Sequence, residues 1–239
     1  MPEITASKSM QHLLFSGQQK LSDLIHANFK LLQVLPRFDI KLGFGDKTVR
    51  EVCQLHYVST HFFLMVCNVS TFDHYFPDTH EASSLDIEEL TTYLENSHRY
   101  YIQNRIPVIK RQLSILAGCC DEKEGTLLKR FFDDYSAEVE SHLNYEENTV
   151  FPYVKNLKKG IKTGPYTIGQ FEKKHGNIED KLHDLKNIII KYLADHRESE
   201  LRHEILFNLF ELEEDLSKHH VFENKILIPF VLQLERQVK

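Results

Sequence analysis

The sequence lacks several features that would place it in familiar functional classes. It has no tryptophan and only four cysteines, none in Cys-x-x-Cys spacing, which argues against a zinc ribbon or a thioredoxin-like site. Positive charge is not in excess: the formal net charge is −6, so general nucleic-acid binding is not expected. No apolar run approaches the roughly 18 residues of a membrane span. The first residues, MPEITASKSMQ, contain no apolar signal-peptide core, so we expect a cytoplasmic protein with reduced thiols.

Strand signals are also scarce, and most of the chain has helical spacing. The sequence contains no Asn-Gly or Asp-Gly hairpin turn and few alternating β-branched runs. Apolar residues recur at helical intervals over residues 84–117, 122–157, 166–193 and 198–235. Pro107 lies inside the first of these stretches and should kink or split it. Four long helices with short connections predict an all-α fold, an up-down-up-down four-helix bundle.

A small helical domain is predicted before the bundle. Residues 20–35 have helical spacing, and Thr48 with Glu51 has the spacing of a capping box at the start of a second helix. A third helix is expected over residues 59–68. The polar segment 73–84 is typical of a linker. We therefore predict a small helical domain at residues 1–78 and the bundle at residues 79–239.

Two segments of the predicted bundle share one pattern. HLNYEENTVFP begins at His142, and HHVFENKILIP begins at His219. Both have histidine at position one, glutamate at position five and proline at position eleven. His142 lies 44 residues after His98, and His219 lies 44 residues after His175, so the two halves are offset by 77 residues. This regularity indicates an internal duplication of a helix pair.

The repeated polar residues lie on the apolar faces of their helices. His98, for example, lies between Leu94 and Ile102 at intervals of one turn. Buried imidazoles and carboxylates are costly unless they are satisfied, and a pair of divalent cations would satisfy all of them. Such donors without thiolate suit iron or manganese better than structural zinc. The predicted ligands are His98, His142, Glu146, His175, His219 and Glu223.

The six-residue ligand set above is one histidine-rich scheme, and two other interpretations of the same residues stay open. One of them is a ferritin-like scheme with two Glu-x-x-His pairs and two single glutamates, namely Glu95/His98, Glu172/His175, Glu146 and Glu223. In the histidine-rich scheme, Glu95 and Glu172 would instead accept hydrogen bonds from the imidazoles one turn away. The third interpretation is a metal-free helical interaction module, in which the inward polar residues pair with one another.

The sequence resembles a known family at these motifs. HLNYEENTVFP and HHVFENKILIP are similar to the two His-x3-Glu motifs of hemerythrin-like (HHE) domains. The resemblance covers nearly the whole chain and is greatest to di-iron proteins linked to repair of iron-sulfur centres. It implies a non-haem di-iron centre with oxo and carboxylate bridges, four terminal histidines and bridging Glu146 and Glu223. The stretch LPRFDIKLGFGDKTVREVC is similar to that group's small helical domain, with Gly43 and Phe44 in place of a Cys-Cys pair.

The resemblance also implies a function. Open iron positions would bind nitric oxide, oxygen or peroxide in nitrosative or oxidative stress, by iron donation to damaged clusters or by nitric oxide reduction. The alternative is an oxygen or iron sensor, or an iron store, without turnover. Expected partners are a small diatomic ligand and damaged iron-sulfur proteins, with neither nucleic acid nor membrane. A homodimer is compatible with the sequence.

Overall fold

The computed structural model describes residues 14–77, 85–162, 164–174, 180–193 and 198–238. These residues form helices and no strand, apart from one isolated bridge between Lys20 and Thr48. The chain divides into two compact units, Met1–Leu85 and Asp86–Lys239. The domain boundary predicted at residues 78 and 79 lies outside the described residues.

The first unit consists of short helices. They are α2 (Leu21–Ala27), α3 (Leu31–Val34), η1 (Leu35–Phe38), α4 (Val49–Leu55) and α5 (Thr60–Thr71). The predicted capping box is confirmed: the Thr48 side chain accepts from the Glu51 amide, and the Glu51 carboxylate accepts from the Thr48 amide. Burial raises the pKa of the Cys53 thiol to about 11, so this thiol stays protonated at neutral pH.

The helix predicted over residues 20–35 is interrupted at Asn28. This residue adopts an extended conformation, with φ −147° and ψ 101°, and caps the end of α2. Its side-chain amide donates to the Ser70 carbonyl and to Thr71 Oγ1, at 3.1 and 3.0 Å. Hydrogen bonds to a distant helix therefore outweigh the local helical pattern.

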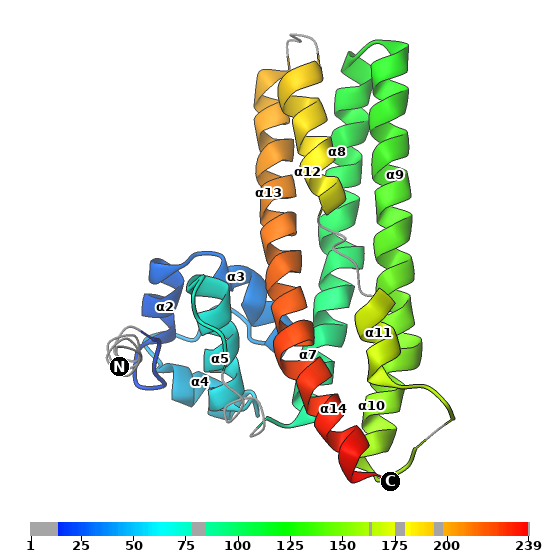
Figure 1. Cartoon of the computed structure of the whole chain (residues 1–239). Helices are drawn as coiled ribbons and strands as arrows, with labels where there is room; N and C mark the ends of the chain where they lie inside the picture. Colours follow the sequence, from blue (N-terminus) through cyan, green and yellow to red (C-terminus); the bar gives the residue numbers. More distant parts are fainter. Residues whose placement is uncertain (1–13, 78–84, 163, 175–179, 194–197, 239) are drawn as a thin grey trace, which may run out of the picture. The chain divides into compact units, whose positions relative to one another are not determined.

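The second unit is the predicted four-helix bundle, with each long helix divided into segments. The segments are α7 (Ile87–Tyr100), η2 (Tyr101–Arg105), α8 (Ile106–Cys119), α9 (Glu122–Tyr145), η3 (Glu146–Val150), α10 (Phe151–Lys158), α11 (Ile168–Lys174), α12 (Asp180–Asn187), η4 (Ile188–Tyr192), α13 (Ser199–Phe222), η5 (Glu223–Leu227) and α14 (Ile228–Gln237). Helices α8, α9, α12 and α13 lie alongside one another (Figure 1), which confirms the all-α bundle. None of the helices in the described ranges is long and apolar enough to cross a bilayer.

The bundle is held by a continuous apolar core, and its second long helix begins at a capping aspartate. Aromatic and aliphatic side chains from all four long helices fill the interior, including Phe132, Tyr135, Leu185 and Leu209. Asp121 caps α9 by accepting from the Lys123 and Glu124 amides at 2.9 and 2.8 Å. This helix carries the predicted ligand His142 and continues into η3, which begins with the predicted ligand Glu146.

Wider π-helical turns occur at the prolines. Among the described residues, η2, η3 and η5 each come directly before a helix whose second residue is proline. A proline within a helix has no N–H to donate and its ring clashes with the preceding turn, and a π turn accommodates both. Pro107 thus divides the first helix, as predicted. The turns η3 and η5 are offset by the same 77 residues as the sequence repeat, and each begins with a repeated glutamate.

Candidate metal centre

His98 lies in the last turn of α7 and is almost completely buried. Its Nδ1 lies 3.0 Å from Glu147 Oε1, and its Nε2 lies 3.1 Å from Glu146 Oε2. An ionised carboxylate only accepts hydrogen bonds, so Nδ1–H donates to Glu147 and fixes the ring orientation. Nε2 therefore faces the interior of the bundle.

His142 and Glu146 lie one turn apart, where α9 continues into η3. His142 Nε2 is 2.6 Å from Glu146 Oε1, whereas His98 Nε2 approaches the other oxygen, Oε2. Glu146 is fully buried. Its two carboxylate oxygens thus face two imidazoles from two different helices.

The second repeat places the same groups at the junction of α13 and η5. His219 Nε2 is 3.0 Å from Glu223 Oε1, and His220 Nε2 is 3.9 Å from Glu223 Oε2. All three residues are buried. Glu223 therefore also presents each of its oxygens to a different imidazole.

These residues form two adjoining groups of metal-ligand atoms. The ligand atoms of His98, Glu146, His219 and Glu223 lie within 4.8 Å of one another. Those of His142, His220 and Glu223 do so as well. Glu223 belongs to both groups, and Glu146 reaches the second group through His142. Carboxylates shared between two ligand groups are the arrangement expected of a dinuclear centre.

The separations fit bound cations. His98 Nε2 and His219 Nε2 are 3.3 Å apart, close enough that a proton or a cation has to lie between their lone pairs. Ligand atoms that each lie about 2.1 Å from one ion are about 3.0–3.4 Å from their neighbours. Glu146 is fully buried, with its two oxygens 2.6 Å from His142 Nε2 and 3.1 Å from His98 Nε2, and a buried carboxylate is costly unless positive charge lies close to it. The donor set therefore fits divalent cations.

The electrostatics of the histidines differ. Burial lowers the pKa of His98, but its hydrogen bonds to Glu146 and Glu147 together outweigh burial and raise the pKa to about 9. Burial also lowers the pKa of His219, and the nearby Glu223 carboxylate offsets this only in part. A metal-bound imidazole cannot hold a proton on the same nitrogen, so a cation binding at His98 has to displace a proton near neutral pH.

A comparison with known families agrees with this geometry. Residues 108–231 match the Hemerythrin HHE cation binding domain, over more than half of the chain. The chain belongs to this family. The matched segment contains both His-x3-Glu motifs, while His98 precedes it. No curated protein matches the chain.

The hemerythrin domain brings most of the predicted ligands together. Five of them lie in the two groups, namely His98, His142, Glu146, His219 and Glu223. The sixth, His175, lies outside the described residues. His220, which is not among the predicted ligands, is buried with its Nε2 3.9 Å from Glu223 Oε2. The ligand role of each residue stays a prediction.

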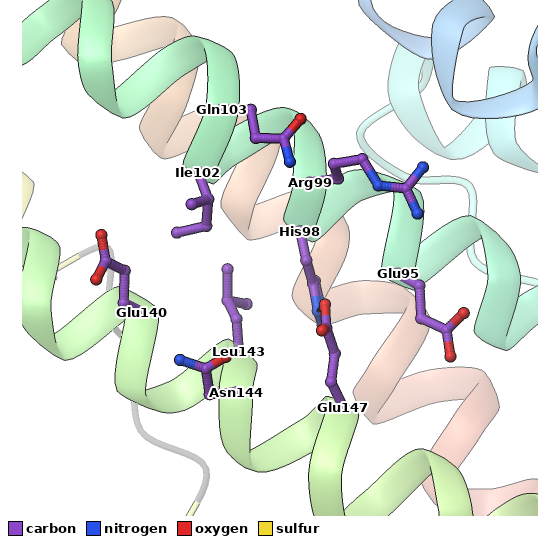
Figure 2. A pocket seen from close by; sticks show the side chains of 9 residues that line it. All are labelled: Glu95, His98, Arg99, Ile102, Gln103, Glu140, Leu143, Asn144 and Glu147. Carbon is purple, nitrogen blue, oxygen red and sulfur yellow. Dashed lines mark hydrogen bonds and ion pairs between the residues drawn. The ribbon is translucent and has the colours of Figure 1, made fainter.

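The acceptor for His98 differs from the one expected. Glu147 accepts from His98 Nδ1, whereas Glu95 accepts from Lys155 Nζ at 2.7 Å. The ring of His98 extends from its helix towards α9, so the acceptor comes from the neighbouring helix and not from the preceding turn (Figure 2). Glu172 is exposed, and its expected partner His175 is not among the described residues. The structure therefore does not favour Glu95 as a ligand, which the ferritin-like scheme requires.

A cavity of about 400 Å³ opens beside the His98–Glu147 pair, between α7 with η2 and α9 with η3 (Figure 2). Its lining consists of Glu95, His98, Arg99, Ile102, Gln103, Glu140, Leu143, Asn144 and Glu147. In Figure 2 the side chains of His98 and Glu147 point towards each other, and Ile102 and Leu143 supply apolar wall. Small molecules can thus reach the outer edge of one imidazole while its Nε2 remains buried.

Replacing Glu147 by alanine should weaken cation binding by roughly 10- to 100-fold, the usual effect of losing a carboxylate that orients a metal-binding histidine. The pKa of Glu147 is lowered by its hydrogen bond to His98, so this carboxylate is ionised when it orients the ring. The measurement is competition of the chain with a metal chelator. Glu140→Ala is the matched control, because Glu140 is exposed in the same cavity. Equal affinities of the two variants would show that Glu147 has no such role.

Proposed function

We propose that this hemerythrin-type chain is a non-haem di-iron protein that binds nitric oxide, oxygen or peroxide. We further propose that it acts in nitrosative or oxidative stress or in repair of iron-sulfur centres. The observation that carries the proposal is the pair of buried carboxylates, Glu146 and Glu223, each facing two imidazoles. Imidazole and carboxylate donors without thiolate favour iron or manganese over structural zinc.

Each residue of the centre has a distinct task in this proposal. His98 and His219 would hold one ion, His142 would hold the other, and Glu146 and Glu223 would be shared between them, with His175 as a further predicted ligand. When bound, the iron pair supplies open coordination positions and electron transfer. Glu147 keeps the His98 ring in the orientation that directs Nε2 inward.

Aromatic side chains exclude water from the buried side of the centre. The Phe151 ring stacks on His98, with centroids 5.5 Å apart, and the Tyr101 ring meets His219 edge-on at 5.7 Å. Both aromatic residues are fully buried. The low local polarity strengthens the interaction between the carboxylates and a bound cation.

The resemblance of LPRFDIKLGFGDKTVREVC to the repair group supports damaged iron-sulfur proteins as partners. A thiol role for the first unit has less support, because Cys53 is buried and has a raised pKa. We therefore propose that any iron delivered to a partner comes from the bundle centre. We also propose that the chain forms a homodimer. We propose that it does not bind nucleic acid, which the net charge of −6 supports.

The test is the reaction of the anaerobically reduced, iron-loaded chain with nitric oxide, followed with a nitric oxide electrode and by infrared spectroscopy of nitrosyl bands. Nitrosyl bands with net consumption of nitric oxide would support a reactive role. Reversible binding without consumption would favour the sensor or storage alternative. If nitric oxide, oxygen and peroxide all fail to change the spectrum of the loaded chain, the proposed function is wrong. His142→Ala should lose the response in parallel with its iron.

A further inference from the structure

His220 lies in the last turn of α13, next to a predicted ligand, and is buried. A histidine that follows another on a helix is rotated by about 100°, so only one of the two is expected to face the centre. The structure nevertheless places both rings around one carboxylate. His219 Nε2 lies 3.0 Å from Glu223 Oε1, and His220 Nε2 lies 3.9 Å from Oε2.

Helical spacing explains how one carboxylate serves both histidines. Glu223 is the first residue of η5, where the helix widens after Phe222. Its carboxylate lies at i+4 from His219 and at i+3 from His220, both of which are same-face distances on a helix. Glu223 can therefore span two ligand groups from a single position.

The ring of His220 also approaches a histidine from another helix. The His142 and His220 centroids are 6.2 Å apart, with the rings nearly perpendicular at 79°. One ligand atom each of His142, His220 and Glu223 lies within 4.8 Å of the others. Two imidazoles from α9 and α13 thus converge with one carboxylate, whereas His98 and His219 converge with two in the first group.

We infer that His220 is a nitrogen ligand of the second cation, opposite the ion that His98 and His219 hold. The motif resemblance assigns one histidine of HHVFENKILIP to the metal, whereas the geometry of this chain supplies two. The inference rests on the proposed two-cation centre. It gives each cation two imidazoles even without His175, with Glu223 common to both groups.

The test is a titration of the metal-free full chain with Co²⁺ under argon, followed by visible absorption and equilibrium dialysis. Wild-type chain should bind two ions. His220→Gln should keep one ion and bind the second at least about 10-fold more weakly. His203→Gln is the matched control, because His203 is an exposed histidine on the same helix, and it should behave as wild type.

A second variant gives a signal that does not depend on loss of binding. His220→Cys places a thiolate at the same position, so Co²⁺ loading should produce a near-ultraviolet sulfur-to-cobalt band that wild type lacks. Circular dichroism shows whether each variant keeps its helices. Two equally tight ions in His220→Gln, together with no such band in His220→Cys, would overturn the assignment. Fewer than two ions in wild type would overturn the two-cation centre itself, so the two failures are distinguishable.

Discussion

Replacing Glu223 by glutamine should weaken cation binding at both positions of the centre, and the stoichiometry should fall from two ions to at most one. The two oxygens of Glu223 face different imidazoles, His219 and His220, so a neutral amide removes one donor atom and the negative charge from both groups. The loss of metal affinity should exceed the roughly 10- to 100-fold loss expected when a residue that only hydrogen-bonds to a ligand is replaced. The number of bound ions is measured by inductively coupled plasma analysis of dialysed protein.

Two further variants separate a shared ligand from an ordinary one. His98→Ala should affect mainly the ion held with His219, because His98 belongs to one ligand group only. Glu204→Ala, an exposed glutamate on the same helix as His219, should leave both ions in place. If Glu223→Gln loses only one ion and holds the other with full affinity, Glu223 does not bridge.

Loading the metal-free chain with cations should raise the stability of the bundle strongly. A ligand at a free concentration of 1,000 times its Kd contributes about 4 kcal/mol to the free energy of unfolding for a single site. For a unit of this size, residues 86–239, that corresponds to a rise of about 8–16 °C in Tm. The physical reason is that the buried carboxylates Glu146 and Glu223 lie among the ligand atoms of one cluster, where a bound cation adds an attraction that the metal-free chain lacks.

Differential scanning calorimetry of chelated and reloaded protein tests this expectation. Glu223→Gln is the informative control, because its metal-free form should gain little from added metal. An equal Tm with and without cations would contradict a metal-dependent bundle. That result would favour the metal-free interaction module, in which the inward polar residues pair with one another.

The sequence was sufficient to predict the bundle and to indicate most of the histidines and glutamates that cluster inside it, because both depend on helical periodicity. Intervals of three and four residues place His142 over Glu146 and His219 over Glu223, and the contacts at 2.6 and 3.0 Å follow from that spacing. The position of Pro107 predicted the break in the first helix, which the structure shows as a π turn.

Features that depend on contacts between helices were not predictable in the same way. The acceptor for His98 comes from the neighbouring helix, at Glu147, while the sequence pointed to Glu95 on the same helix. His220 lies on the face next to that of His219, and it approaches Glu223 across an interval of three residues. The break at Asn28 depends on acceptors more than 40 residues away.

The most direct test of the central claim is the iron content of the chain after anaerobic reconstitution, measured together with its visible absorption after oxidation. The account predicts close to two irons per chain and absorption bands that require a bridged iron pair. His142→Ala and His219→Ala should each lower the stoichiometry. No retained iron, with a Tm unchanged by reconstitution, would contradict a dinuclear centre at Glu146 and Glu223.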